Sequence, residues 1–142
     1  MNDNPQLQRV EQAVLAMPMA RTLGLRFTQL AAGEVEVELP ITEALSFSPG
    51  RLQATAVFAA ADFAAVSAAG SVLPVGWRNA TVDATLKLVA PAAGRAVRAR
   101  GRVVHGGPLL TVCAAEVYAV APEGGETLCA TLLATARNIR PD

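Results

Sequence analysis

The chain has 142 residues with 12 basic and 12 acidic side chains, and 52% of its residues are hydrophobic while 4% are aromatic. This length and apolar content predict one compact, soluble domain and exclude intrinsic disorder. The formal net charge of zero argues against nucleic-acid binding, because no excess of basic side chains is present to neutralise a run of phosphates. Nucleic acid is therefore not an expected partner.

The first apolar pattern belongs to residues 4–17, where apolar side chains recur at helical spacing. It predicts a short amphipathic helix that Pro18 ends and that packs on the outside of the fold. Residues 34–39 then alternate glutamate with an apolar residue, which predicts a strand with one wet face. The three glutamates on that face have the residue type of a metal or acid–base cluster, but we interpret them as solvated charges.

A long apolar segment follows a polar loop. Residues 52–70 are rich in alanine and apolar nearly all round, which predicts a helix enclosed by the rest of the protein. With the residues up to 77, the segment is long enough to cross a membrane. Asp62 at mid-span would cost roughly 3 kcal/mol on insertion, and Gly70 and Pro74 interrupt the far half. We therefore predict a core helix and expect no membrane partner.

The remainder of the chain alternates strand patterns with turn residues. The order helix, strand, long helix and four strands is typical of an α+β domain with a helix packed on an antiparallel sheet. No linker divides it, so we expect a helical lead-in over residues 1–20 and a single domain over residues 21–140. The last four strands are predicted at residues 81–89, 95–104, 109–120 and 127–137.

Two features of the sequence bear on cofactors and location. Cys113 and Cys129 have no histidine partner at ligand spacing, so we interpret both as small core residues and expect no metal, disulfide or redox cofactor. The polar residues 1–8 lack the basic and then apolar order of a secretory signal, so we expect a cytoplasmic protein.

Asp62 carries the clearest chemical signal. Burying a carboxylate inside an apolar helix is costly unless another element or another subunit satisfies it, or a cavity reaches it. A structural hydrogen-bonding role stays open, but a carboxylate in an apolar cleft is favoured as an acid–base group or nucleophile. No partner comes from its own helix, because the residues three and four positions away are Phe58, Ala59, Ala65 and Val66.

The loop that enters this helix, together with the order of elements, resembles the PaaI-like acyl-CoA thioesterases of the hot-dog superfamily. In that family a loop written G-x-x-H-G-G leads into the central helix, and an Asp or Glu follows nine residues after the histidine. Here residues 50–55 read GRLQAT, and Asp62 stands nine residues after Gln53. Gln53 replaces the family's histidine, and Ala54 and Thr55 replace its glycine pair. The resemblance covers residues 23–139.

The resemblance implies a hot-dog fold, in which a sheet of five or six antiparallel strands wraps a long central helix. It also implies an acyl-CoA thioesterase for a small, medium or aromatic acyl group, with coenzyme A as part of the substrate. The assembly would be a homodimer, with residues 81–89 at the two-fold interface, or a dimer of dimers. The implied catalytic residues are Asp62, from the partner subunit, as base or nucleophile, and Gln53, Ala54 and Thr55 as donors to the thioester carbonyl; the implied substrate contacts are Gly50, Arg51, Phe58, Val66 and Ser67.

Two other functions stay open at this stage. One is a hot-dog protein that binds an acyl thioester or a fatty ligand without hydrolysing it, and the other is a structural protein whose apolar helix only builds a dimer core. Dehydration is disfavoured, because the residues after Asp62 lack the Asn and His of related dehydratases. His105, although followed by two glycines, comes after a strand, so we interpret it as a turn residue. Candidates for coenzyme phosphate contacts are Arg51, Arg78 and Arg102, although a solvated position is the simpler interpretation of each.

Overall fold

Six antiparallel strands form one sheet that curves around a central helix. The computed structural model describes residues 4–142, and the strands are ordered β1-β2-β6-β7-β8-β5. The helices are α1 (Pro5–Leu15), α2 (Pro18–Leu23) and α3 (Ala54–Ser71), with a 3₁₀ turn at Glu43–Leu45. The strands are β1 (Arg26–Ala31), β2 (Glu34–Pro40), β3 (Ser46–Ser48), β4 (Arg51–Leu52), β5 (Arg78–Leu88), β6 (Ala96–Gly106), β7 (Leu110–Val120) and β8 (Glu126–Ile139).

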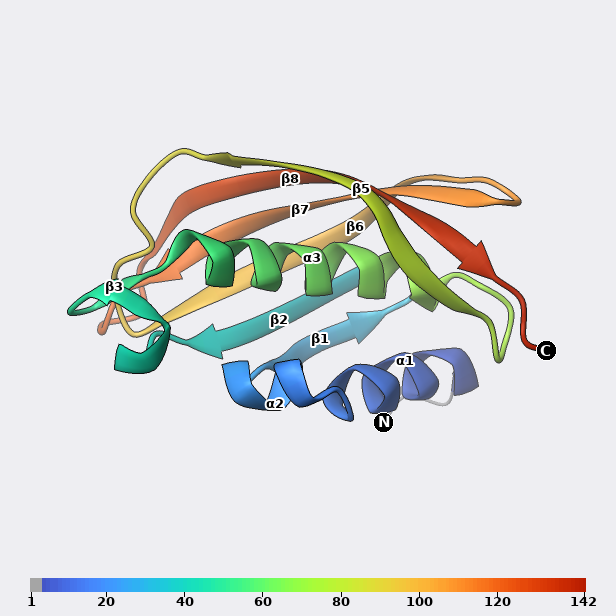
Figure 1. Ribbon diagram of the computed structural model, residues 1–142, viewed down its shortest axis with the longest axis horizontal. Helices are drawn as coiled ribbons and strands as arrows, with labels where there is room; N and C mark the ends of the chain where they lie inside the picture. Colours follow the sequence, from blue (N-terminus) through green and yellow to red (C-terminus); the bar gives the residue numbers. More distant parts are fainter. Residues whose placement is uncertain (1–3) are drawn as a thin grey trace.

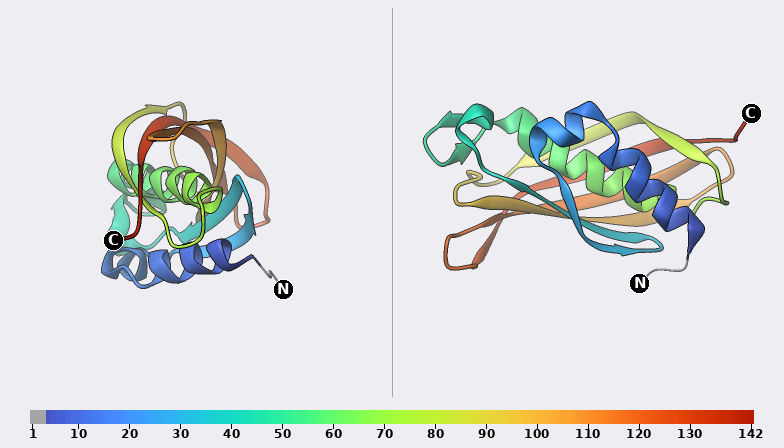
Figure 2. Two further views of the ribbon diagram at one scale, coloured as in Figure 1. Left: turned by 90° about the vertical axis from the view of Figure 1, so that its right-hand side faces the viewer. Right: turned by 90° about the horizontal axis from the view of Figure 1, so that it is seen from below.

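The arrangement of layers places α3 at the centre of the molecule (Figure 1). The view along α3 shows the sheet wrapped around it, with α1 along the side that the sheet leaves open (Figure 2, left). By length and composition α3 passes as a candidate membrane span, yet 67% of it is buried inside the fold, as expected of a core helix. The α+β class, the antiparallel sheet and the central helix are all confirmed.

Small side chains let α3 lie close to the sheet. Ala60, Ala61, Ala64 and Ala65 are fully buried, and Gly101 of β6 faces the helix backbone. A Cβ built on Gly101 would lie 2.1 Å from the carbonyl oxygen of Ala64, so only glycine permits this approach.

Replacing Gly101 by alanine is expected to destabilise the protein by about 3 kcal/mol, because the added methyl group forces α3 away from β6. Gly106→Ala is the matched control on the same strand, since a Cβ added at Gly106 would have no other atom within 4 Å. Urea unfolding followed by circular dichroism measures both variants. Equal midpoints for Gly101→Ala and the control would contradict the close approach.

Five of the observed elements are absent from the expected order, namely α2, β1, the 3₁₀ turn, β3 and β4. Pro18, expected only to end a helix, also occupies the first turn of α2, where its missing N–H removes no hydrogen bond. The edge strand β1 pairs with β2 alone and is half-exposed, so its apolar periodicity is weak. The short β3–β4 hairpin lies in the segment expected to be a polar loop. His105 lies within β6, opposite Val112, and not in the turn where we expected it.

The glutamates of β2 lie on the face of the sheet away from α3. Glu36 and Glu38 are 9% and 4% exposed, so the expectation of solvated charges is wrong for both. Glu38 forms salt bridges with Arg26 at 2.8 Å and Arg98 at 2.7 Å, and Glu36 pairs with Arg100 at 2.7 Å. The arginines cover the carboxylates because Arg98 and Arg100 lie directly opposite them on β6.

The ion pairs of Glu38 favour the charged form of this buried carboxylate. Burial alone would raise the pKa of Glu38, but hydrogen bonds from Arg26 and Arg98 outweigh it and leave the pKa below its usual value. Across residues 4–142, no group of three or more His, Cys, Asp or Glu side chains is placed to hold a metal ion. We assign this face of the sheet a structural role.

Candidate active site

Asp62 lies in the third turn of α3, where β5 crosses the helix. Its Oδ1 accepts a hydrogen bond from Thr81 Oγ1 of β5 at 2.9 Å. Burial raises the pKa of Asp62 above its usual value, and the hydrogen bond from Thr81 only partly offsets that rise. Within residues 4–142 no salt bridge neutralises the carboxylate. Asp62 is thus a more basic carboxylate than one in water.

The two cysteines are free and buried, as expected of core residues. Burial and, to a smaller extent, the charge of Asp62 raise the pKa of Cys113 to about 11. Burial also raises the pKa of Cys129 to about 11. Both thiols are therefore protonated at neutral pH and are poor nucleophiles.

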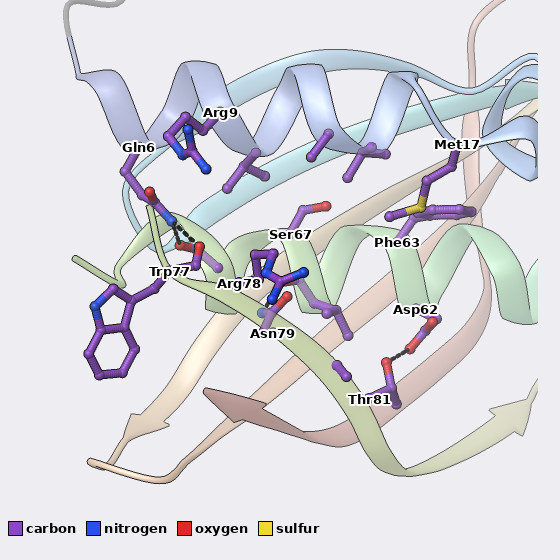
Figure 3. Close-up of a pocket in the computed structure, with 16 residues that line it drawn as sticks. Gln6, Arg9, Met17, Asp62, Phe63, Ser67, Trp77, Arg78, Asn79 and Thr81 are labelled. Atoms are coloured by element: carbon purple, nitrogen blue, oxygen red, sulfur yellow. Dashed lines mark hydrogen bonds between the residues drawn. The ribbon is translucent and has the colours of Figure 1, made fainter. Parts of the chain in front are cut away.

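A cavity of about 460 Å³ opens beside Asp62, between α1, α3 and β5. Asp62 and Thr81 lie toward one end of it, together with Met17 and Phe63, whereas Gln6 and Trp77 lie toward the other (Figure 3). Most of the lining between the ends is apolar. Of the residues expected to contact substrate, the cavity includes Val66 and Ser67.

The first helix closes one side of this cavity, a role that its amphipathic pattern alone did not predict. Gln6 is 2% exposed and anchors the start of α1. Its Nε2 donates to the carbonyl oxygens of Gly70 at 3.0 Å and Trp77 at 3.1 Å, and its Oε1 accepts from the amide of Gly76 at 3.0 Å. The three bonds fix α1 against the end of α3 and so give the cavity a wall.

The other expected catalytic residues lie at the N-terminus of α3. Gln53 is the N-cap, and its Oε1 accepts hydrogen bonds from the amide of Thr55 at 2.6 Å and from the Thr55 hydroxyl. The Thr55 amide is thus already occupied. In the described chain, the amide of Ala54 has no protein acceptor, and the Gln53 side chain keeps its Nε2 as a free donor.

One copy of the chain does not bring these two groups of residues together. Nine residues of helix separate Gln53 from Asp62, which corresponds to roughly 13 Å at 1.5 Å per residue. Gly50 and Arg51 lie with Gln53 at the entrance to the helix, outside the cavity. Phe58 lies one turn before Asp62 and is 36% exposed. The residues expected to act on one thioester therefore form two separate half-sites.

The structure also separates the candidate phosphate-binding arginines. Arg78 lines the cavity, whereas Arg51 is exposed in β4. Arg102 forms a salt bridge with Glu116 on the face of the sheet away from α3. Thr81, by contrast, is a site residue that we expected only on the polar face of its strand. The one sequence signal for Thr81 is that it is a polar residue on the strand that follows the central helix.

No protein-family model and no curated protein matches this sequence. Among solved structures, a thioesterase family protein from Silicibacter pomeroyi is 33% identical, with a TM-score of 0.90 over 94% of this chain and 98% of that chain. The E. coli PaaI protein from the phenylacetic acid degradation operon is 19% identical, with a TM-score of 0.82 over 98% and 97% of the two chains.

A thioesterase from Haemophilus influenzae is also 19% identical, with a TM-score of 0.80 over 94% of this chain and 90% of that chain. At this identity the last two structures show a shared fold alone. The first match is different, because its identity of 33% extends over nearly the whole of both chains. The chain therefore belongs to the thioesterase family and has the hot-dog fold of its PaaI-like members.

Proposed function

We propose that this protein hydrolyses acyl-CoA thioesters of small, medium or aromatic acyl groups. The observation that carries the proposal is Asp62, a half-buried carboxylate with a raised pKa that faces an apolar cavity of about 460 Å³. Such a cavity is large enough for an acyl chain or a ring. A carboxylate there is the base or nucleophile that thioester hydrolysis requires.

The catalytic site is complete only in a dimer. A carbonyl group beside Asp62 lies roughly 13 Å from the N-terminus of the same α3, which is too far for a hydrogen bond. A second copy related by a two-fold axis would place its own Gln53 and Ala54 beside Asp62. The edge strand β5 supports this assembly, because its Val82 and Leu88 are 56% and 54% exposed and its outer edge is unpaired in the described chain.

In the proposed reaction, Asp62 of one subunit activates a water molecule by taking a proton from it. The water oxygen bonds to the carbonyl carbon, and negative charge develops on the carbonyl oxygen. The amide of Ala54 and Nε2 of Gln53, both from the second subunit, donate hydrogen bonds to that oxygen, and the dipole of α3 adds to their effect. The C–S bond then breaks, and the leaving sulfur takes up the proton from Asp62.

The test is the release of free thiol from short, long and aromatic acyl-CoAs by the purified protein. Turnover above the rate without protein supports the proposal and identifies the acyl class. Failure to release thiol from any acyl-CoA overturns it. In that case a rise in melting temperature with added acyl-CoA would identify a non-catalytic binder of acyl thioesters, because a ligand of the native state stabilises that state.

Thr81 is expected to set the pH range of the activity. Its hydrogen bond favours the ionised form of Asp62 and lowers the pKa of that carboxyl. In Thr81→Val the pKa of Asp62 rises further, so the acid limb of kcat/KM moves to higher pH. Rate profiles between pH 4 and pH 9 measure the change.

The control for this profile is Thr127→Val. Thr127 lies on β8, away from the proposed dimer edge on β5, where it is exposed and pairs with Ala119 of β7. The control is expected to keep the wild-type profile. An acid limb that stays in place in Thr81→Val would show that Thr81 does not tune the base.

A further inference from the structure

Two positive charges line this cavity, and the proposed reaction uses neither of them. Arg9 of α1 and Arg78 of β5 both line the cavity. In the close-up view Arg9 lies beside Gln6, Arg78 lies nearer the middle of the cavity beside Asn79, and Asp62 and Thr81 lie toward the other end (Figure 3). Both arginines are exposed in one copy of the chain, so a ligand in the cavity can reach them.

These two arginines differ from those on the outer face of the sheet. Each arginine of that outer group forms a salt bridge with a glutamate, whereas Arg9 and Arg78 form none with any residue in 4–142. Asp62 is the one carboxylate among the cavity-lining residues of the described chain, and it lies toward the opposite end. The two arginines that line the cavity thus have no carboxylate partner in the described chain. The paired arginines are Arg26, Arg95, Arg98, Arg100 and Arg102.

Most of the lining between the two ends is apolar, and the polar residues among it are Ser67 and Asn79, whose Nδ2 already donates to the carbonyl oxygen of Val66 at 2.9 Å. Val10 and Val14 of α1 and Val66 of α3 contribute to the apolar lining. The length of this apolar passage follows from the spacing of residues along α3 and β5. Asp62 and Gly70 are eight residues apart on α3, or roughly 12 Å, and Thr81 and Arg78 are three residues apart on β5, or roughly 10 Å. A chain of methylene groups suits this passage, whereas the amides of a pantetheine arm would lose their hydrogen bonds with water in it.

We propose that Arg9 and Arg78 bind a carboxylate at the end of the acyl group remote from the thioester. The inference rests on the proposed function and narrows its substrate class to ω-carboxyacyl thioesters of about six to eight carbons, a chain length that follows from the passage of roughly 10–12 Å. Guanidinium groups bind carboxylates through paired, charge-assisted hydrogen bonds. The thioester carbonyl then lies beside Asp62 while the acyl chain fills the apolar passage.

The experiment compares matched acyl groups with and without the remote carboxylate. Adipoyl and hexanoyl thioesters, and suberoyl and octanoyl thioesters, are each prepared on coenzyme A and on pantetheine, which lacks the phosphates. The wild type is expected to show a kcat/KM for the carboxyacyl member that is about tenfold or more higher, on both carriers. Arg9→Gln and Arg78→Gln are each expected to lower that ratio about tenfold.

Arg21→Gln is the matched control, because Arg21 lies on α2 outside the cavity and forms no salt bridge in the described chain. Its ratio is expected to equal that of the wild type. An equal or higher kcat/KM for hexanoyl and octanoyl thioesters in the wild type would overturn the proposal. So would an effect of Arg78→Gln confined to coenzyme A thioesters, since that result would assign Arg78 to the coenzyme phosphates.

A separate binding measurement keeps the inference distinct from the proposed function. If no thioester is hydrolysed, the proposed function fails, and calorimetric titration with adipate and hexanoate still tests the arginine site. Tighter binding of adipate by the wild type, lost in Arg78→Gln, supports the site. Equal binding of the two acids overturns it.

Discussion

Asp62→Asn is expected to lower kcat/KM for thioester hydrolysis by roughly 10³-fold or more, within the range that a general base contributes. Asparagine has nearly the same shape as aspartate, and its Oδ1 can still accept the hydrogen bond from Thr81. It has no basic oxygen to take a proton from water. The change therefore removes the chemistry while it leaves the contacts of α3 in place. Thiol release from the best acyl-CoA substrate measures it.

The same variant is expected to be at least as stable as the wild type at neutral pH. Because burial raises the pKa of Asp62 in the folded protein, ionising this group above its unfolded pKa costs stability, and a neutral amide removes that cost. Below that pKa the two proteins are expected to converge. Glu123→Gln, at an exposed position between β7 and β8, is the control, expected to change neither turnover nor melting temperature. Undiminished turnover in Asp62→Asn would rule out the mechanism.

The sequence predicts best those features that depend on local periodicity. The alanine-rich pattern places the central helix within two residues of its observed limits, and the spacing from Gln53 to Asp62 gives the register of the carboxylate. Because a charge is costly to bury inside an apolar helix, the sequence alone marks Asp62 as a candidate site residue. Residues 34–39 show the same dependence on periodicity, because Val35, Val37 and Leu39 are buried as the period of two predicts.

Contacts between distant segments are what the sequence leaves out. Thr81 is 19 residues from Asp62, and a strand pattern shows which face a threonine occupies but not which side chain it meets. Gln6 is 64 residues from Gly70, so its role in closing the cavity has no local signal. The alternating pattern of their own strand predicts that Glu36 and Glu38 are exposed. They become buried only because the register of β6 brings arginines over them.

The resemblance to the family also leaves the donor geometry open, since the glycine pair is replaced. Only the structure shows that Gln53 turns its oxygen back onto Thr55 and leaves the Ala54 amide without an acceptor in the described chain. This arrangement leaves one backbone N–H free to donate, the one that the proposed mechanism uses. It also makes that N–H removable by mutation, because Ala54 is the first residue of α3.

Ala54→Pro is expected to lower kcat about 10²- to 10³-fold, the cost of losing one donor to the developing oxyanion, or about 3 kcal/mol. Proline has no N–H, and the first position of a helix is where it is best tolerated. Gln53 already has φ −67° and ψ 144°, the extended conformation that a following proline requires. The helix is therefore expected to form as before, with its donor absent.

Ala54→Ser is the control for this substitution, because it changes the side chain at an exposed position and keeps the N–H. It is expected to retain most of the turnover. Circular dichroism and the melting temperature of Ala54→Pro are expected to match those of the wild type, since the amide has no partner within residues 4–142. Full activity in a folded Ala54→Pro protein would exclude this amide from the reaction. If kcat of Ala54→Pro is low with every acyl group while KM stays at the wild-type value, the N–H stabilises the transition state and does not contribute to substrate binding.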